Sequence, residues 1–335
     1  MNKTLQSIIA SIFFTSAITF NSNAQIAIAN LDRIPELKNG TTYIVMKDPD
    51  FPGAKEYIEM FKRTWTISKI QFIKYSDVHN HYDKGNYFLS IGGYKFDEQY
   101  TPMFGGFFGG ADGNTNDYPK GAWFKETYIY LELWTCTDNY LENKKDKELK
   151  INNTIQLARI DAYTDIPAYK EPKYLYAEEY NSTVRIRNWG VGILENYVQS
   201  MMTYFNNNQE RKLYSAITNN AELAKLKTET LYVPNYLLIQ YDKKTNGETG
   251  KHIESDLFEK YTLKHKLLTI EELNTKISNK EEPIYYFIYV KSRVDKFVSV
   301  VNSVTGEMIY SRYTPMSYNI QPDDLYDLQL AIQSK

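Results

Sequence analysis

The chain has 335 residues, of which 42% are hydrophobic and 24% are charged, and its formal net charge at pH 7 is −2. This balance is typical of a globular protein, and without clustered excess lysine and arginine it argues against nucleic acid as a partner. The single cysteine, Cys136, excludes an internal disulfide, and we expect its thiol to be buried and inert.

The first 24 residues have the layout of a secretory signal peptide. Lys3 supplies the positive start, Leu5 to Phe20 form an uncharged apolar run, and Ser22-Asn23-Ala24 is a small-x-small cleavage site. The apolar run is shorter than the roughly 20 residues that cross a bilayer as a helix. We therefore expect an exported protein, periplasmic or secreted, that begins at Gln25 and has no transmembrane segment after cleavage.

Residues 25–206 have the pattern of a first α+β unit. Apolar and alternating runs predict strands at 42–46, 69–75, 86–91, 126–135 and 154–163. Residues 54–63 and 189–205 carry apolar side chains at helical spacing, and Ser76-Asp77 opens a short helix between two of the strands. Residues 207–229 are then predicted to form a helical connector.

Residues 230–335 repeat the same order of elements. Strands are predicted at 231–240, 261–268, 284–291, 297–302 and 307–312, with helices at 253–260, 270–278 and 323–333. Thr269 and Glu272 match a capping box, and Pro322 stands early in its helix. One local match pairs Asn86-Tyr87-Phe88 with Tyr285-Tyr286-Phe287. We interpret the order as an internal duplication, with chance similarity between two α/β domains as the alternative.

The predicted fold class is therefore α+β, with two tandem units. Each unit is expected to be a mixed β-sheet with helices packed mainly on one face. The units differ by insertions in the first, at Gly92–Lys125 and at Thr137–Asn153. Loops on a rigid scaffold often carry specificity, so we expect function to lie in these insertions.

The most unusual segment of the chain is Met103–Asn114, which combines paired glycines with three phenylalanines. Paired glycines permit close backbone approach, and the phenylalanines supply apolar anchors. The candidate ligand-binding residues are Phe104, Phe107, Phe108, Asp112 and Asn114. The alternative is a loop that packs its phenylalanines into the core of its own sheet.

No motif predicts a cofactor or a metal. Asp112-x-Asn114-x-Asn116 begins like an EF-hand loop, but Asp117 stands where the turn needs glycine, and Trp123 where the last ligand should be glutamate. No phosphate-binding loop occurs, and Gly190-Val191-Gly192 lacks the third glycine of a dinucleotide fingerprint. His79-Asn80-His81 lacks the i, i+4 spacing of two zinc ligands on a helix.

No catalytic constellation rises above background, so we predict an exported, non-enzymatic binding or envelope-assembly protein with a protein or glycan partner. The 30 tyrosines fit either buried strands or an exposed binding face. One alternative is a secreted hydrolase that draws on Asp48, Asp50, His79 and Asp112. Another is a structural subunit of an envelope complex.

Overall fold

The computed structural model describes residues 25–99, 123–143, 149–164, 186–242, 247–280, 283–292, 295–315, 317 and 319–334. The predicted signal peptide lies outside these ranges, and so do all five candidate ligand-binding residues: Phe104, Phe107, Phe108, Asp112 and Asn114. Within the described ranges, no helix is both long and apolar enough to cross a membrane.

The first unit is built on a six-stranded mixed sheet, in the order β1-β6-β5-β4-β2-β3. Strands β2, β3 and β4 are parallel, and the pairs β4–β5, β5–β6 and β6–β1 are antiparallel. Its elements are β1 Ile26–Ile28, η1 Leu31–Arg33, α1 Ile34–Asn39, β2 Thr41–Met46, α2 Ala54–Thr64, β3 Lys69–Lys74, η2 Tyr75–His81, β4 Asn86–Gln99, β5 Trp123–Cys136, α3 Asp138–Asn143, η4 Ile151–Asn153, β6 Thr154–Asp161 and α6 Val191–Asn206.

The second unit repeats this sheet, in the order β7-β14-β13-β12-β8-β11, with the same parallel and antiparallel pairings. A separate hairpin pairs β9 with β10. The elements are β7 Ile217–Thr218, α7 Asn220–Leu223, η5 Ala224–Lys227, β8 Leu231–Pro234, η6 Asn235–Leu238, β9 Ile239–Asp242, β10 Gly247–Lys251, α8 Glu254–Leu257, β11 His265–Leu268, α9 Ile270–Ser278, β12 Tyr285–Ser292, β13 Asp295–Asn302, β14 Met308–Thr314 and α10 Pro322–Gln333.

The two sheets share a β-bulge, which sets the residue correspondence between them. In the first sheet, the register of β5 with β6 shifts between Leu133 and Trp134 of β5, so Leu157 is the extra residue on β6. In the second sheet, the register of β13 with β14 shifts between Val300 and Val301 of β13, so Ile309 is the extra residue on β14. A bulge at the same place in matching strands supports duplication, because bulges are retained as specific features of a sheet. The prediction of two α+β units is confirmed.

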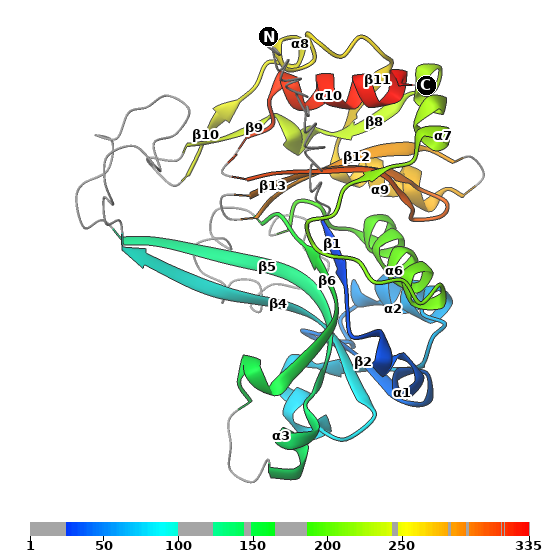
Figure 1. The fold of residues 1–335 in the computed structure, drawn as a ribbon, viewed down its shortest axis with the longest axis vertical. Coiled ribbons are helices and arrows are strands. Elements are labelled where there is room, and N and C mark those ends of the chain that lie inside the picture. The colour runs from blue at the N-terminus through cyan, green and yellow to red at the C-terminus, as the bar shows by residue number, and fades with distance from the viewer. Residues whose placement is uncertain are drawn as a thin grey trace, which may run out of the picture.

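The units stack as alternating layers of sheet and helices (Figure 1). Neighbouring residues on β12 mark the two faces of the second sheet, since successive strand residues point to opposite sides. Tyr285 Oη donates to Glu222 Oε2 of α7 at 2.6 Å, whereas Tyr286 Oη donates to Asn196 Oδ1 of α6 at 2.9 Å. Helix α6, which is the last element of the first unit, therefore also covers one face of the second sheet.

Local sequence explains where several elements begin and end. The capping box of Thr269 and Glu272 is present at the start of α9, and Pro322 opens α10. The strand predicted at 231–240 is interrupted, because β8 ends at Pro234, which has no backbone N–H to continue a ladder, and η6 follows. Residues 207–229, predicted as a connector, contain α7 and η5 and also β7, which pairs with β14.

The tyrosines whose burial the structure describes lie mainly in the core. Tyr87, Tyr286 and Tyr289 on the central strands are at most 1% exposed, whereas Tyr75, Tyr214 and Tyr326 are exposed on the surface. Cys136 is buried in a cluster with Phe88 and Trp134 on the face of the first sheet opposite α6. The described tyrosines thus fit the interpretation as strand and core residues.

Candidate functional site

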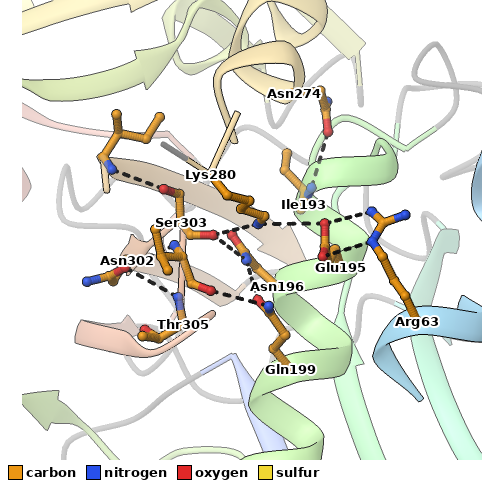
Figure 2. Close-up of polar contacts among 12 residues, drawn as sticks. Arg63, Ile193, Glu195, Asn196, Gln199, Asn274, Lys280, Asn302, Ser303 and Thr305 are labelled. Carbon is orange, nitrogen blue, oxygen red and sulfur yellow. Dashed lines mark hydrogen bonds and ion pairs between the residues drawn. The ribbon is translucent and has the colours of Figure 1, made fainter. Parts of the chain in front are cut away.

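Glu195 of α6 is the centre of an ion cluster that joins the two units (Figure 2). The side chain of Glu195 is 7% exposed and accepts two hydrogen bonds from Arg63, at the end of α2. Lys280, which follows α9, lies 3.6 Å from Glu195 Oε2 and donates to Ser303 O at 2.9 Å. Burial lowers the pKa of Lys280, while Glu195 acts in the opposite direction. One carboxylate therefore joins α2, α6 and the second unit.

A neutral network continues along the same helix. Asn196 Nδ2 donates to Ser303 O at 2.8 Å and to Gln199 Oε1 at 2.6 Å, and its Oδ1 accepts from buried Tyr286. Gln199 in turn donates to Val304 O at 3.3 Å. These contacts fasten the β13–β14 turn onto α6, so the junction is a fixed structural contact (Figure 2).

The glycines before and in α6 serve helix packing. Gly190 has φ +143°, and a Cβ there would lie 2.1 Å from Asn274 Nδ2; a Cβ on Gly192 would lie 2.9 Å from Ile277 Cβ. Asn274 Oδ1 accepts from the Ile193 amide at 3.1 Å (Figure 2). The Asn274 side chain of α9 is thus hydrogen-bonded to a backbone amide at the start of α6, which is the type of group that could otherwise bind an anion. The Gly-x-Gly segment permits close contact between α6 and α9.

The most perturbed carboxyl group lies at the end of β6. Asp161 is 1% exposed and accepts from Arg159 Nε and Nη2, at 3.0 and 2.7 Å. Burial raises the pKa of Asp161 to about 6 against the lowering effect of Arg159, and Asp295 of the second unit adds a smaller raising effect. Gln25 donates to the Asp161 carbonyl at 2.7 Å and to Tyr197 Oη at 3.0 Å. The group fits a structural ion pair.

The two six-stranded sheets differ most clearly in the hairpin of β4 and β5. In the second unit, the corresponding hairpin closes at the pair Ser292 and Asp295. The correspondence set by the bulge matches this pair to Tyr94 and Tyr128. The first hairpin continues for five further pairs, from Lys95 with Thr127 to Gln99 with Trp123. We call these residues, Lys95–Gln99 and Trp123–Thr127, the arm, and it projects from the body (Figure 1).

Both edges of the arm are open within the described part of the chain. Strand β2 pairs with β4 only as far as Leu89, and β6 pairs with β5 only from Tyr130 onward. No strand in the described ranges pairs with the outer edges of the arm. An open strand edge presents unpaired N–H and C=O groups in a row, to which another extended chain can add. The arm is therefore the candidate functional site.

The predicted site residues belong to the segment that joins the two arm strands. Phe104, Phe107, Phe108, Asp112 and Asn114 lie between Gln99 and Trp123 in the sequence and outside the described residues. Their role as ligand-binding residues stays a prediction.

The sequence analysis treated all of 92–125 as a loop insertion and so missed the arm strands except for Glu126 and Thr127, which belong to the predicted strand 126–135. A signal was present, because Tyr94 and Phe96 alternate with Lys95 and Asp97. The pattern is short and has little apolar content, which makes it weak evidence for a strand. The pairing with β5 shows that β4 continues to Gln99.

Of the residues named for a hydrolase, Asp48 and Asp50 make surface contacts, and Asp112 lies outside the described residues. Asp48 Oδ1 lies 3.1 Å from Lys74 Nζ and accepts from the Asp50 amide at 3.2 Å. The hydrogen bond from Lys74 holds the pKa of Asp48 below its usual value, which suits a permanently charged group. His79 is exposed, and its neighbour His81 stacks on Tyr43. In the described ranges, no group of three or more His, Cys, Asp or Glu residues could hold a metal ion.

No family model matches the sequence, and the searches of curated proteins and solved structures returned no significant match.

Proposed function

We propose that the protein is exported and acts as a non-enzymatic binding or envelope-assembly module that contacts its partner through the arm and the segment between its strands. The observation that carries this proposal is the comparison of the two units. The six-stranded sheet is repeated with the same strand order, yet the first hairpin runs five pairs beyond the point where the second one closes.

The two units provide a rigid base for the arm. At the junction, Glu195 pairs with Lys280 of the second unit and Asn196 donates to the Ser303 carbonyl, so polar contacts fix the two units to each other. A rigid scaffold lowers the entropy that is lost when a projecting segment binds. The arm is thus presented on a base whose own core requires no partner.

The geometry favours a polypeptide over a glycan. Open strand edges bind extended chains through main-chain hydrogen bonds, which tolerate many side chains at the added strand. A two-stranded ribbon is also only marginally stable in water, and an added strand would stabilise it. We therefore propose strand addition to the arm as the mode of binding.

An arm-less variant tests the proposal. Residues 95–127 are replaced by Asn-Gly, a dipeptide suited to a two-residue hairpin turn, so that the pair Tyr94 and Tyr128 closes the hairpin as Ser292 and Asp295 do in the second unit. Tagged full-length and arm-less proteins are used to capture partners from envelope fractions of the producing cells. We expect a discrete bound species with the full chain only. Equal capture by an arm-less protein with an unchanged melting temperature would overturn the proposal.

A further inference from the structure

We propose that the strand added to the arm is the arm of a second copy of this chain, with β4 antiparallel to the partner's β4 and centred on Phe96. This inference rests on the proposed function and names its partner. It assigns a homodimer in which two arms form one four-stranded sheet.

Backbone geometry restricts how a strand can pair with its own copy. In an antiparallel pair, directly opposite residues either exchange both hydrogen bonds or exchange none. Along one edge of a strand, every second residue directs its N–H and C=O outward. In a strand paired with its own copy, two residues that stand opposite each other must be of the same kind, so their residue numbers differ by an even number. The two-fold axis can therefore pass through a residue, but not between two residues.

Charge selects one register among those that remain on β4. Centring on Phe96 places Lys95 opposite the second copy's Asp97, and symmetry repeats the pair. Centring on Lys95, Asp97 or Glu98 instead places a charged residue opposite its own copy. Opposite charges across a strand pair are stabilising, whereas like charges are destabilising. Phe96 is therefore the favoured centre.

The same test disfavours the β5 edge. Pairing of β5 with its copy near the middle of the arm would be centred on Lys125 or on Glu126, and each would face its own charge. The unpaired edge of β4 is also longer than that of β5, since the pairing of β4 with β2 ends at Leu89, whereas the pairing of β5 with β6 begins at Tyr130. A four-stranded sheet made through β4 would contain three strand pairings instead of the two in a pair of separate ribbons, each of which alone is marginally stable.

Charge reversal is the first test, with molecular mass measured by light scattering across a concentration series. The full chain is expected to dimerise. Lys95→Asp and Asp97→Lys each create two like-charge pairs and should weaken dimerisation at least about tenfold. The double variant Lys95→Asp/Asp97→Lys restores both opposite pairs, as does a mixture of the two single variants. Restoration by both routes is the expected result, because only the centred register pairs residue 95 with residue 97.

Cysteine cross-linking is the second test and reads the register directly. Phe96→Cys would face its own copy at a Cα separation of about 4.5–5.5 Å, within the range for a disulfide. The matched control, Glu98→Cys, would be displaced from its copy by roughly 14 Å along the strands. The native Cys136 is 3% exposed, so the background should be low. We expect a cross-linked dimer from the first variant only.

The outcomes separate this inference from the proposed function. A monomeric full chain, a dimer indifferent to both single charge reversals, or equal cross-linking at positions 96 and 98 would overturn self-pairing. If the monomeric protein still captures another polypeptide in an arm-dependent way, self-pairing alone is rejected and the binding function stands. If the arm-less variant behaves like the full chain in mass and in capture, both are rejected.

Discussion

Leu157 and Ile309 are corresponding residues, each the extra residue of a β-bulge in one of two sheets with the same strand order. Both are 0% exposed, so each bulge directs an apolar side chain into the core. The correspondence aligns the strands on either side and shows where the two units differ. The largest difference in the described strands is the arm, which begins after Tyr94 and ends before Tyr128.

The contact between α6 and α9 requires glycine at its closest point. Gly190→Ala should destabilise the protein by about 2–4 kcal/mol, because φ is +143° and the added Cβ would overlap Asn274. The matched control is Gly250→Ala, where the nearest atom to an added Cβ is the side-chain oxygen of Gln240 at 3.8 Å. Urea denaturation measures both. Similar stability losses in the two variants would contradict this account of α6 packing.

The neutral network at α6 should be energetically important. Asn196→Ala leaves the buried Tyr286 hydroxyl and the Ser303 carbonyl without this partner, and we expect a loss of about 1–3 kcal/mol in unfolding free energy. Asn39→Ala is the control, since Asn39 is exposed and bonds only to the Pro35 carbonyl within its own helix. A loss below about 0.5 kcal/mol for Asn196→Ala would show that the junction is held by apolar packing instead.

Asp161 should give stability a measurable pH dependence. Its folded pKa of about 6 lies above the ordinary value of 3.8 for an aspartate. Proton binding by Asp161 therefore favours the folded state fully below about pH 4, and this contribution is lost as pH rises through about 6. The shift corresponds to about 3 kcal/mol at most. Other carboxyl groups also titrate in this range, so the measured quantity is the difference between wild type and Asp161→Asn.

Urea denaturation of both proteins at several pH values between 4 and 7 gives that difference. We expect the stability of wild type relative to Asp161→Asn to fall as pH rises, although the substitution removes the Arg159–Asp161 ion pair at every pH. A difference that stays constant from pH 4 to 7 would show that the Asp161 carboxyl is not desolvated in the folded protein.

Cys136 should be unreactive in the folded protein. Its thiol is buried beside Phe88 and Trp134 on the covered face of the first sheet. A thiol reagent should label one group per chain in denaturant and react at least about a hundredfold more slowly under native conditions. Fast native labelling would mean that this face of the sheet opens readily.

Elements with strong local signals could be predicted from the sequence. The capping box of Thr269 and Glu272 and the apolar spacing of α6 are local features, and the structure contains both elements. The order of the longer strands in the two units was also predictable, because most of them have their own apolar run, whereas the short strands β1, β7 and β10 were not predicted. These features depend on neighbouring residues and not on tertiary contacts.

The residue correspondence between the units could not be predicted. The sequence match pairs Asn86 with Tyr285, whereas the bulge and the helix-facing contacts pair Tyr87 with Tyr285. Strand β12 is buried at every residue, so no alternation marks which face points to which layer. A shift by one residue is invisible in such a strand, although it exchanges the two faces of the sheet.

The junction could not be predicted for a related reason. Glu195, Arg63 and Lys280 are separated widely in the sequence, and each has the appearance of an ordinary surface charge. Their convergence depends on how α2, α6 and the second unit pack. The raised pKa of Asp161 likewise arises from burial, which a single carboxyl group in a sequence does not reveal.

Site-specific photo-crosslinking in the producing cells tests most directly whether the arm makes the contact with a partner. A photoreactive phenylalanine analogue replaces Phe96 in the arm or, as an aromatic control, Tyr326, which is 41% exposed on α10. We predict a discrete cross-linked product from position 96 and none from position 326. No product at position 96, or equal products at both positions, would contradict the account.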